Sequence, residues 1–198
     1  MRNRLIFDSE NRFNQPQSVE VVVNNQLIIK AMKTLYILRH AKSSWALVEQ
    51  LPDHERPLLE EGKKRTRKLI NYLLTNHIKP ELILCSTAKR ASETAGYIAS
   101  ALAIENAQIK LIPSLYNAGV EQIFNQFIDL DNSLNSIMIV GHNPSLTNFV
   151  NNWLKSPIDW LPTSGLVGIE FDTKDWEELL KAKAEVKFVV FPKQLKGQ

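Results

Sequence analysis

The feature that most constrains the fold is a regular alternation of short apolar runs with amphipathic stretches, which begins at Thr34. The apolar runs have the length of strands and contain the branched and aromatic residues that strands favour. They cover residues 35–38, 82–85, 109–112, 137–140, 166–171 and 186–191. The stretches between them carry apolar residues at helical spacing, over residues 58–76, 88–103, 119–130 and 144–155. This order predicts an α/β fold of three layers, with a mostly parallel central sheet flanked by helices.

The first part of the chain lacks this pattern. We therefore divide the sequence into an N-terminal extension over residues 1–32 and a single domain over residues 33–198. Within the extension, residues 19–29 hold two apolar stretches around Asn24 and Asn25, which is typical of a hairpin. The extension is either such a hairpin, a mobile arm, or sequence upstream of the natural start, and it carries no recognisable chemistry.

Composition narrows the class of protein. With 198 residues, of which 44% are hydrophobic, the chain can bury the core of one ordinary domain. No apolar run approaches the roughly 20 residues that cross a bilayer, and the start does not resemble a signal peptide. The lone Cys85 lies in an apolar run, so we expect a packed core thiol in a reducing compartment. These features predict a cytoplasmic protein with no membrane partner.

The net charge of +3 is mild; it suits an anionic substrate without requiring nucleic acid. The basic residues at 63–68 are interpreted as a solvated helix face, so no nucleic-acid partner is expected. Trp153 and Trp160 are interpreted as core residues more readily than as interface residues.

Basic side chains follow three of the predicted strands. Arg39 and His40 come after the first strand, Arg90 lies just beyond the second, and His142 follows the fourth. In open α/β sheets, ligands bind outside the carboxyl ends of the strands. Taken singly, each residue has an ordinary explanation, as a surface charge or a loop histidine. Together they indicate a site.

The neighbours of these residues also have an ordinary explanation. Ser86, Thr87 and Asn143 precede predicted helices and are typical helix caps, and Pro144 suits the first helical position.

The chemistry of this set points to phosphate. Arginine binds phosphate with two parallel hydrogen bonds and stays charged at any relevant pH, while helix N-termini add N–H donors. A neutral imidazole can attack phosphorus. The sequence has no glycine-rich phosphate loop, and no His, Asp or Glu spacing that suggests a metal pair. We therefore expect phosphoryl chemistry without a cofactor or metal.

Four segments carry a resemblance to a known family. The segment Arg39-His40-Ala41 resembles the Arg-His-Gly signature of the histidine phosphatase superfamily, which includes the phosphoglycerate mutases. The continuation Lys42-Ser43 and the segment 53–62 resemble the small SixA-type phosphohistidine phosphatases. Residues 86–95 resemble the second arginine segment of the family and residues 140–144 its second histidine segment. The resemblance covers about residues 33–191.

The resemblance implies a phosphoglycerate mutase-like fold, here without a large helical cap because the segment before the fourth strand is short. It implies that His40 is phosphorylated and then hydrolysed. Arg39 and Arg90 would hold the phosphate oxygens, and His142 would complete the clamp. Lys42, Ser43 and Arg56 are expected at the border of the site. Ser43 and Arg56 are further candidates for substrate binding, and a structural role is equally open for Arg56.

The proton donor is the main departure from the family. The mutase-like branch has a donor carboxylate after the third strand, but residues 113–119 contain no acid here. Asp53 and Glu55 remain candidates for this role, although solvated loop carboxylates are the more ordinary interpretation. A leaving imidazole has a conjugate-acid pKa of only about 6.5 and needs little acid help. An alcohol is far more basic and needs a donor.

The sequence therefore favours a phosphohistidine phosphatase that acts on a histidine-phosphorylated protein. Two alternatives stay open: a phosphatase of small phosphate esters or pyrophosphates, and a non-catalytic phosphate-binding module.

Overall fold

The computed structural model describes residues 19–23, 26–30, 32–44 and 51–195. Its main sheet has the order β5-β4-β6-β3-β7-β8. The strands are β3 (Lys33–Arg39), β4 (Leu82–Ser86), β5 (Ile109–Ile112), β6 (Ser136–Gly141), β7 (Leu166–Asp172) and β8 (Lys183–Val190). The first four strands in this order are parallel, whereas β7 and β8 are antiparallel to their neighbours. The prediction of a mostly parallel central sheet is confirmed, and the reversal of β7 was not anticipated.

The reversal follows from where the chain lies when it enters β7. After β6 the chain passes through α4 (Ser145–Val150) and returns to the carboxyl edge of the sheet, where residues 164 and 165 bond to the end of β3. The Ser164 N–H donates to the Arg39 carbonyl at 3.0 Å, and the Arg39 N–H donates to the Gly165 carbonyl at 3.1 Å. Since β7 begins where β3 ends, it must run back along β3.

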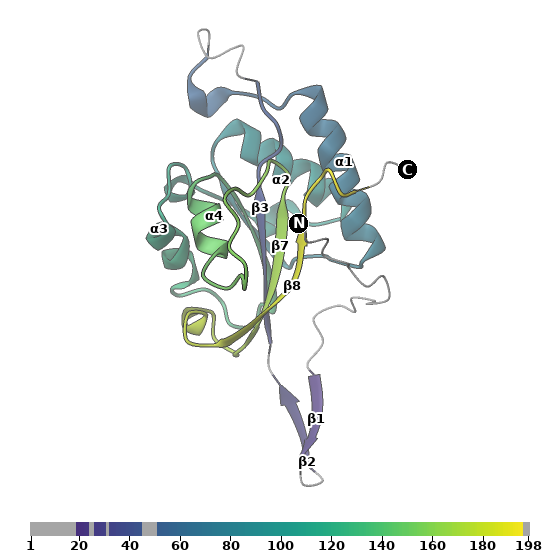
Figure 1. The fold of residues 1–198 in the computed structure, drawn as a ribbon, viewed down its shortest axis with the longest axis vertical. Helices are drawn as coiled ribbons and strands as arrows, with labels where there is room; N and C mark the ends of the chain where they lie inside the picture. The colour runs from purple at the N-terminus through teal and green to yellow at the C-terminus, as the bar shows by residue number, and fades with distance from the viewer. Residues whose placement is uncertain (1–18, 24–25, 31, 45–50, 196–198) are drawn as a thin grey trace, which may run out of the picture.

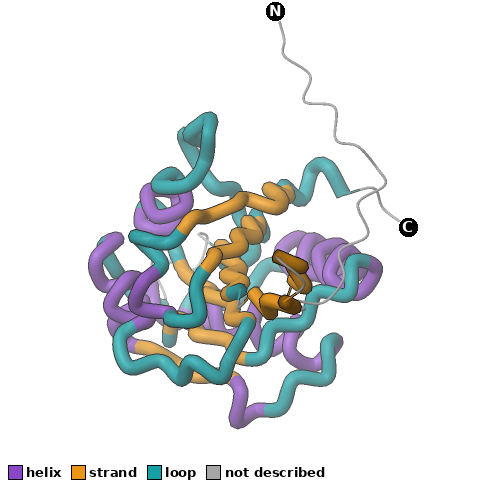
Figure 2. Tube along the Cα trace, turned by 90° about the horizontal axis from the view of Figure 1, so that it is seen from below, coloured by secondary structure: helices purple, strands orange, loops and turns teal. Residues whose placement is uncertain are grey.

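Helices cover both faces of this sheet (Figures 1 and 2). On one face, α1 (Glu60–Thr75) and α2 (Lys89–Ala101) bury residues such as Leu69 and Ile98 against the sheet. On the other face, α3 (Val120–Phe124) and α4 (Ser145–Val150) bury Ile123 and Phe149. The predicted three-layer α/β architecture is confirmed. Cys85 is fully buried in β4, and this burial raises the pKa of its thiol to about 12, as expected for a core cysteine.

Short 3-10 turns complete the order of elements. They are η1 (Asp53–Glu55), η2 (Asn106–Gln108), η3 (Pro113–Leu115), η4 (Asn125–Phe127) and η5 (Trp176–Glu178). The segment from 102 to 135 contains only β5, α3 and three of these turns, so no large helical cap stands over the sheet edge. Among the described residues, no helix is both long and apolar enough to cross a membrane.

Two helices are shorter than their apolar spacing predicts. The pattern over residues 144–155 gives a helix only to Val150, because the next side chain competes for backbone groups. Asn151 donates through Nδ2 to the Ile158 carbonyl and accepts the Ile158 N–H, at 2.9 and 3.0 Å. The pattern over residues 119–130 likewise ends as helix at Phe124 and continues as η4. Trp153, beyond α4, still packs against the core, as expected.

The N-terminal extension is described only in part. β1 (Val19–Val23) and β2 (Gln26–Lys30) pair antiparallel, with Val19 opposite Lys30, as a hairpin requires. Figure 1 shows this pair projecting from the end of the main sheet at which β3 begins. The predicted turn residues Asn24 and Asn25, and residues 1–18, lie outside the described residues. The division into an extension and a domain at residue 33 stays a prediction.

The two long helices end in the same way. His77 after α1 and Ala103 after α2 both have left-handed backbone, with φ of 53° and 50°. In each case the following N–H reaches back five residues to a helix carbonyl, from Ile104 to Ala99 at 2.9 Å in α2. This is the Schellman arrangement, in which glycine is the preferred residue because it has no Cβ to strain. Neither helix has a glycine there.

We predict that Ala103→Gly raises the free energy of unfolding by about 0.5–1 kcal/mol, because it relieves the left-handed strain. The matched control is Ala101→Gly, an exposed position at the end of the same helix, which should lower the stability by a similar amount. Urea unfolding of both variants measures the effect. A destabilised Ala103→Gly variant would contradict this interpretation.

Candidate active site

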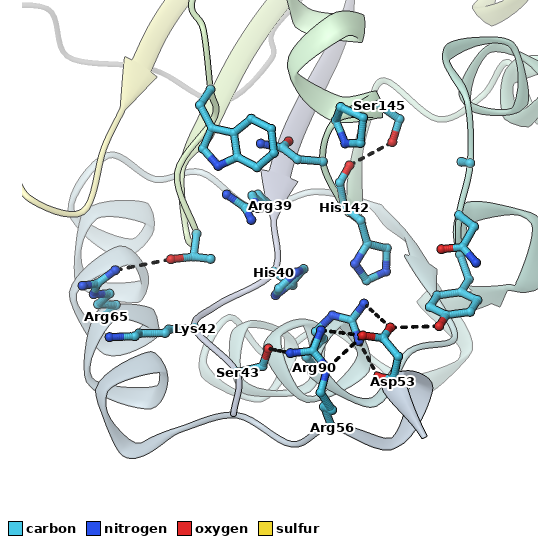
Figure 3. A pocket seen from close by; sticks show the side chains of 17 residues that line it. Arg39, His40, Lys42, Ser43, Asp53, Arg56, Arg65, Arg90, His142 and Ser145 are labelled. Carbon is cyan, nitrogen blue, oxygen red and sulfur yellow. Dashed lines mark hydrogen bonds and ion pairs between the residues drawn. The ribbon is translucent and has the colours of Figure 1, made fainter. Parts of the chain in front are cut away.

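A cavity of about 870 Å³ opens at the carboxyl edge of β3, β4 and β6 (Figure 3). The four residues predicted from the strand ends, Arg39, His40, Arg90 and His142, all line it. The remaining lining residues are Lys42, Ser43, Asp53, Arg56, Arg65, Tyr116, Asn117, Ala118, Asn143, Pro144, Ser145, Trp160 and Thr163. Five of the lining side chains are cationic and one is a carboxylate, so the cavity is built for an anion.

His40 presents one ring nitrogen as a nucleophile. Its Nδ1 lies 2.7 Å from the Ala41 carbonyl oxygen. A carbonyl only accepts, so Nδ1 must carry the proton and Nε2 must carry the lone pair. Burial, followed by the nearby His142, lowers the pKa of His40 well below its usual range, with Arg90 and Arg39 acting in the same direction. The hydrogen bond to Ala41 opposes this shift but does not reverse it. His40 is therefore a neutral imidazole at neutral pH.

The segment after His40 is held by two helices. The Ala41 N–H donates to Thr94 Oγ1 at 3.0 Å, which ties it to α2. The start of α1 lies directly against Lys42, whose carbonyl accepts the Leu59 N–H at 3.0 Å. A Cβ at Gly62 would lie 2.2 Å from that carbonyl oxygen, so only glycine allows α1 to approach this closely. Gly62 thus fixes the backbone beside the nucleophile.

His142 faces His40, with 5.0 Å between the ring centroids. Its Nε2 lies 2.7 Å from Ser86 Oγ, and that oxygen also accepts the Ala88 N–H at 3.3 Å. With the Ala88 bond in place, the Ser86 hydroxyl can give its own hydrogen to Nε2. Nδ1 of His142 then carries the ring proton; it is buried and has no partner among the described residues.

The role predicted for Ser86 from the sequence, that of a helix cap, is wrong. Its place before a helix favoured a helix cap, but α2 begins at Lys89 without a side-chain cap. Ser86 is fully buried beneath the cavity and orients His142 instead. Asn143 is also no helix cap, because its Nδ2 donates to the Leu161 carbonyl at 2.9 Å.

The two arginines are anchored at their ends. Arg39 donates from Nη1 to the Leu161 carbonyl at 2.9 Å. Arg90 donates from Nη1 and Nη2 to the backbone carbonyl and the carboxylate of Asp53, at 2.7 and 3.0 Å. In both arginines Nε is buried and lacks a partner within the described part of the chain. Burial, with the charge of Arg90, lowers the pKa of Arg39 to about 10, so it stays cationic at neutral pH.

Asp53 accepts hydrogen bonds from three side chains as an ionised carboxylate. It accepts from Arg90, from Arg56 at 2.7 Å and from the Tyr116 hydroxyl at 2.9 Å (Figure 3). Partial burial raises its pKa, but the hydrogen bonds from Tyr116 and Arg56 and the charge of Arg90 outweigh this and lower it to about 2. Glu55 is exposed, pairs with His54 at 3.1 Å, and does not line the cavity.

The two predicted border residues meet each other. Arg56 is buried and donates from Nη1 to Ser43 Oγ at 3.2 Å and to the Ser44 carbonyl at 3.0 Å. Both Arg56 and Ser43 line the cavity, and their role in substrate binding stays a prediction. Arg56 also ties η1, and with it Asp53, to the segment after His40.

Two aromatic residues at the cavity were not anticipated. Tyr116 comes from the stretch that lacks an acid, and its ring lies edge-on to His142 with 5.8 Å between centroids. Trp160, which the sequence favours as a core residue, is 53% exposed and lies 5.0 Å above the Arg39 guanidinium. No local pattern marks either residue, since both come from loops that only the fold brings to this edge.

The arrangement can bind a tetrahedral oxyanion and attack it. The cationic side chains of Arg39 and Arg90 and the imidazole of His142 line the cavity as possible donors, and His40 Nε2 has a lone pair without a partner among the described residues. In the part of the chain that the structure describes, no group of three or more His, Cys, Asp and Glu side chains is placed to hold a metal ion.

Sequence comparisons relate part of the chain to a known family. The family model of the histidine phosphatase superfamily (branch 1) matches residues 35–119. An uncharacterized protein of Mycobacterium leprae is 28% identical over 160 residues, which are 75% of this chain and 96% of that protein. An uncharacterized chloroplastic protein of Arabidopsis thaliana is 31% identical over 121 residues, which are 56% of this chain and 54% of its own length.

Solved structures show the same fold. The SixA protein of Agrobacterium tumefaciens superposes with a TM-score of 0.67 at 26% identity, covering 81% of this chain and 98% of that one. The protein histidine phosphatase SixA complexed with tungstate superposes with a TM-score of 0.69 at 21% identity, covering 82% and 99%. The second likeness is one of fold alone.

The buried histidines predict a loss of stability in acid. Burial, together with Arg90 and against the opposing charge of Asp53, lowers the pKa of His142 to about 3, whereas an unfolded histidine titrates near pH 6.5. Between these values the unfolded state binds more protons, so the free energy of unfolding falls as the pH drops from about 6.5. We expect His142→Gln to flatten this slope by up to about 1.4 kcal/mol per pH unit.

Denaturant unfolding between pH 7 and pH 4 measures that slope. His77→Gln, at the exposed end of α1, controls for the loss of a histidine elsewhere. An unchanged slope in His142→Gln would show that His142 is not held neutral in the fold.

Proposed function

Since the chain belongs to the histidine phosphatase superfamily and has the SixA-type fold, we propose that this phosphatase removes phosphate from a histidine-phosphorylated protein through a phosphorylated His40. The observation that carries the proposal is the orientation of the groups around His40. His40 Nε2 has no hydrogen-bond partner among the described residues, and the side chains of Arg39, Arg90 and His142 line the same cavity.

The reaction proceeds in two transfers. His40 Nε2 attacks phosphorus while the bond between phosphorus and the substrate nitrogen breaks, and that nitrogen keeps the electron pair and takes a proton. Water then attacks the phosphoryl group on His40, releases inorganic phosphate, and returns His40 with its lone pair. Arg39, Arg90 and His142 donate to the equatorial oxygens, whose charge they stabilise in each transfer.

Phosphohistidine is the preferred substrate because the cavity offers poor acid catalysis. The donor candidate Asp53 is held as an anion, and the other candidate, Glu55, stands outside the cavity. An alcohol that leaves from a phosphate ester needs a proton in the transition state, whereas imidazole is a weak base and leaves readily. The alternatives, a phosphatase of small esters or pyrophosphates and a non-catalytic phosphate-binding module, lack a comparable supporting observation.

The open edge of the sheet supports a protein as substrate. Among the described residues no large cap covers the cavity, so a phosphohistidine on a folded partner can approach it. The related SixA with tungstate is described as a protein histidine phosphatase. The proposal places the enzyme in the cytoplasm, where its unpaired, buried Cys85 stays reduced.

We predict that His40→Ala lowers phosphate release from a phosphohistidine-bearing protein domain at least about a thousandfold, because the nucleophile is lost. With radiolabelled substrate, wild type should also carry a transient label that survives alkali and is lost in acid. His77→Gln, a histidine remote from the cavity, should behave like wild type. Equal phosphate release by His40→Ala and wild type would refute the proposal, and binding without turnover would favour the non-catalytic module.

A second variant tests the substrate class. Asp53→Asn should lower kcat/KM for phosphohistidine and for a phosphate ester by similar factors, because it weakens the anchoring of Arg90 for both. A general acid would contribute about 10²–10⁴-fold, mainly to the ester. The measurement is the ratio of the two kcat/KM values in wild type and variant. A selective loss of that size with the ester would make Asp53 the proton donor and favour the ester phosphatase.

A further inference from the structure

A second group of charged side chains lies beside the phosphoryl site. Glu61 in α1 accepts from Lys42 Nζ at 2.5 Å through Oε2 and pairs with Arg65 through Oε1. Arg65 also donates from Nη1 to Thr163 Oγ1 at 3.3 Å. Lys42, Arg65 and Thr163 line the cavity, whereas Glu61 does not. Figure 3 shows Lys42 and Arg65 on the opposite side of His40 from Asp53.

The charges of this group do not balance. One carboxylate serves two cations, so the group keeps one positive charge next to a cavity that is already cationic. The phosphoryl clamp needs neither Lys42 nor Arg65, because Arg39, Arg90 and His142 already provide its donors. The side chains of Lys42, Arg65 and Glu61 are 43%, 30% and 48% exposed. Such exposed ion pairs are weak and exchange partners at little cost.

Glu61 also shows which ligand fits. Each of its carboxylate oxygens meets a different cation, so the spacing of Lys42 and Arg65 matches the two oxygens of one carboxylate. An external carboxylate can take this place when Glu61 turns toward solvent.

We propose that Lys42, Arg65 and Thr163 form a second anion-binding site, which receives an aspartate or glutamate close to the phosphohistidine of the substrate protein. Glu61 occupies the two cations in the free enzyme and competes with that acidic side chain. The inference rests on the proposed function, because it names a feature of the same substrate. It makes α1 a specificity element as well as a layer of the fold.

A purely structural role for Glu61 predicts something different. Glu61 and Arg65 are one helical turn apart, and such pairs stabilise helices. In that case Glu61→Gln lowers the stability slightly and leaves substrate affinity unchanged. Competition with the substrate predicts that Glu61→Gln improves binding of an acidic substrate, so the two interpretations differ in sign.

The test compares two peptides that carry a stable phosphonate analogue of phosphohistidine, one with flanking glutamates and one with glutamines in their place. Calorimetry gives the Kd of each peptide, and the ratio of the two values isolates the second site. We expect Glu61→Gln to increase the preference for the acidic peptide about threefold, and Lys42→Met or Arg65→Met to reduce it about tenfold. The control is Lys64→Met, which removes an exposed charge from α1 outside the cavity.

Two results would overturn the second site. The first is a preference for the acidic peptide that stays the same in the Lys42, Arg65 and Glu61 variants. The second is an equal loss of this preference in Lys64→Met, which would indicate general attraction by the positive charge of α1. The preference should also weaken as salt rises from 0.05 to about 0.5 M, since exposed charges are screened. Turnover of the corresponding phosphohistidine peptides by wild type is measured separately. Failure of turnover with intact acidic preference would refute the proposed function but retain the second site.

Discussion

The parallel pairing of β3 with β6 is the interaction on which the rest of the site depends. Its register sets Arg39 opposite Gly141, so the next residue of each strand is a histidine. The His40 N–H extends the ladder by donating to the Gly141 carbonyl at 3.1 Å. The two imidazoles therefore face each other at the sheet edge, 5.0 Å apart, and a shift of one residue in this register would separate them.

Burial then decides the protonation of this pair. Two histidines enclosed with two arginines cannot readily take up protons, because each new positive charge would be desolvated and repelled. Both pKa values are lowered, so His40 keeps the lone pair that a nucleophile needs and His142 acts as a neutral donor. The arginines stay charged because their intrinsic basicity is far greater. The same environment thus produces neutral imidazoles and permanent cations side by side.

Hydrogen bonds from neighbouring residues hold the side chains of the cavity in place before a ligand binds. Asp53 holds Arg90 and Arg56, the Leu161 carbonyl holds Arg39, and Ser86 holds His142. Arg39, Arg90 and His142 each keep one buried nitrogen without a partner among the described residues. The Lys42–Glu61–Arg65 group differs, because its cations share an exposed carboxylate that can be exchanged. The anchored side chains suit the phosphoryl group, which is the same in every substrate. The Lys42–Glu61–Arg65 group suits the residues around it, which differ between substrates.

Much of this could be predicted from the sequence. Apolar runs of strand length fixed the layers, and the residues after them identified Arg39, His40, Arg90 and His142, because the end of a parallel strand is where a side chain meets a ligand. The extent of α4 was not predictable, since Asn151 diverts the backbone through a bond to Ile158, a contact that periodicity does not encode. The roles of Ser86, Tyr116 and Trp160 depend on partners that lie 56, 63 and 121 residues away along the chain.

The sequence by itself determined the architecture and the chemical identity of the clamp, because strand and helix periodicity and the chemistry of arginine and histidine are local properties. Only the tertiary structure decided which imidazole nitrogen faces the cavity, that Asp53 is an anchored anion, and that Glu61 bridges two cations. These outcomes depend on hydrogen-bond direction, burial and distance between segments that are far apart along the chain. The residues around His40 predict it as a nucleophile, but its neutrality comes from the fold.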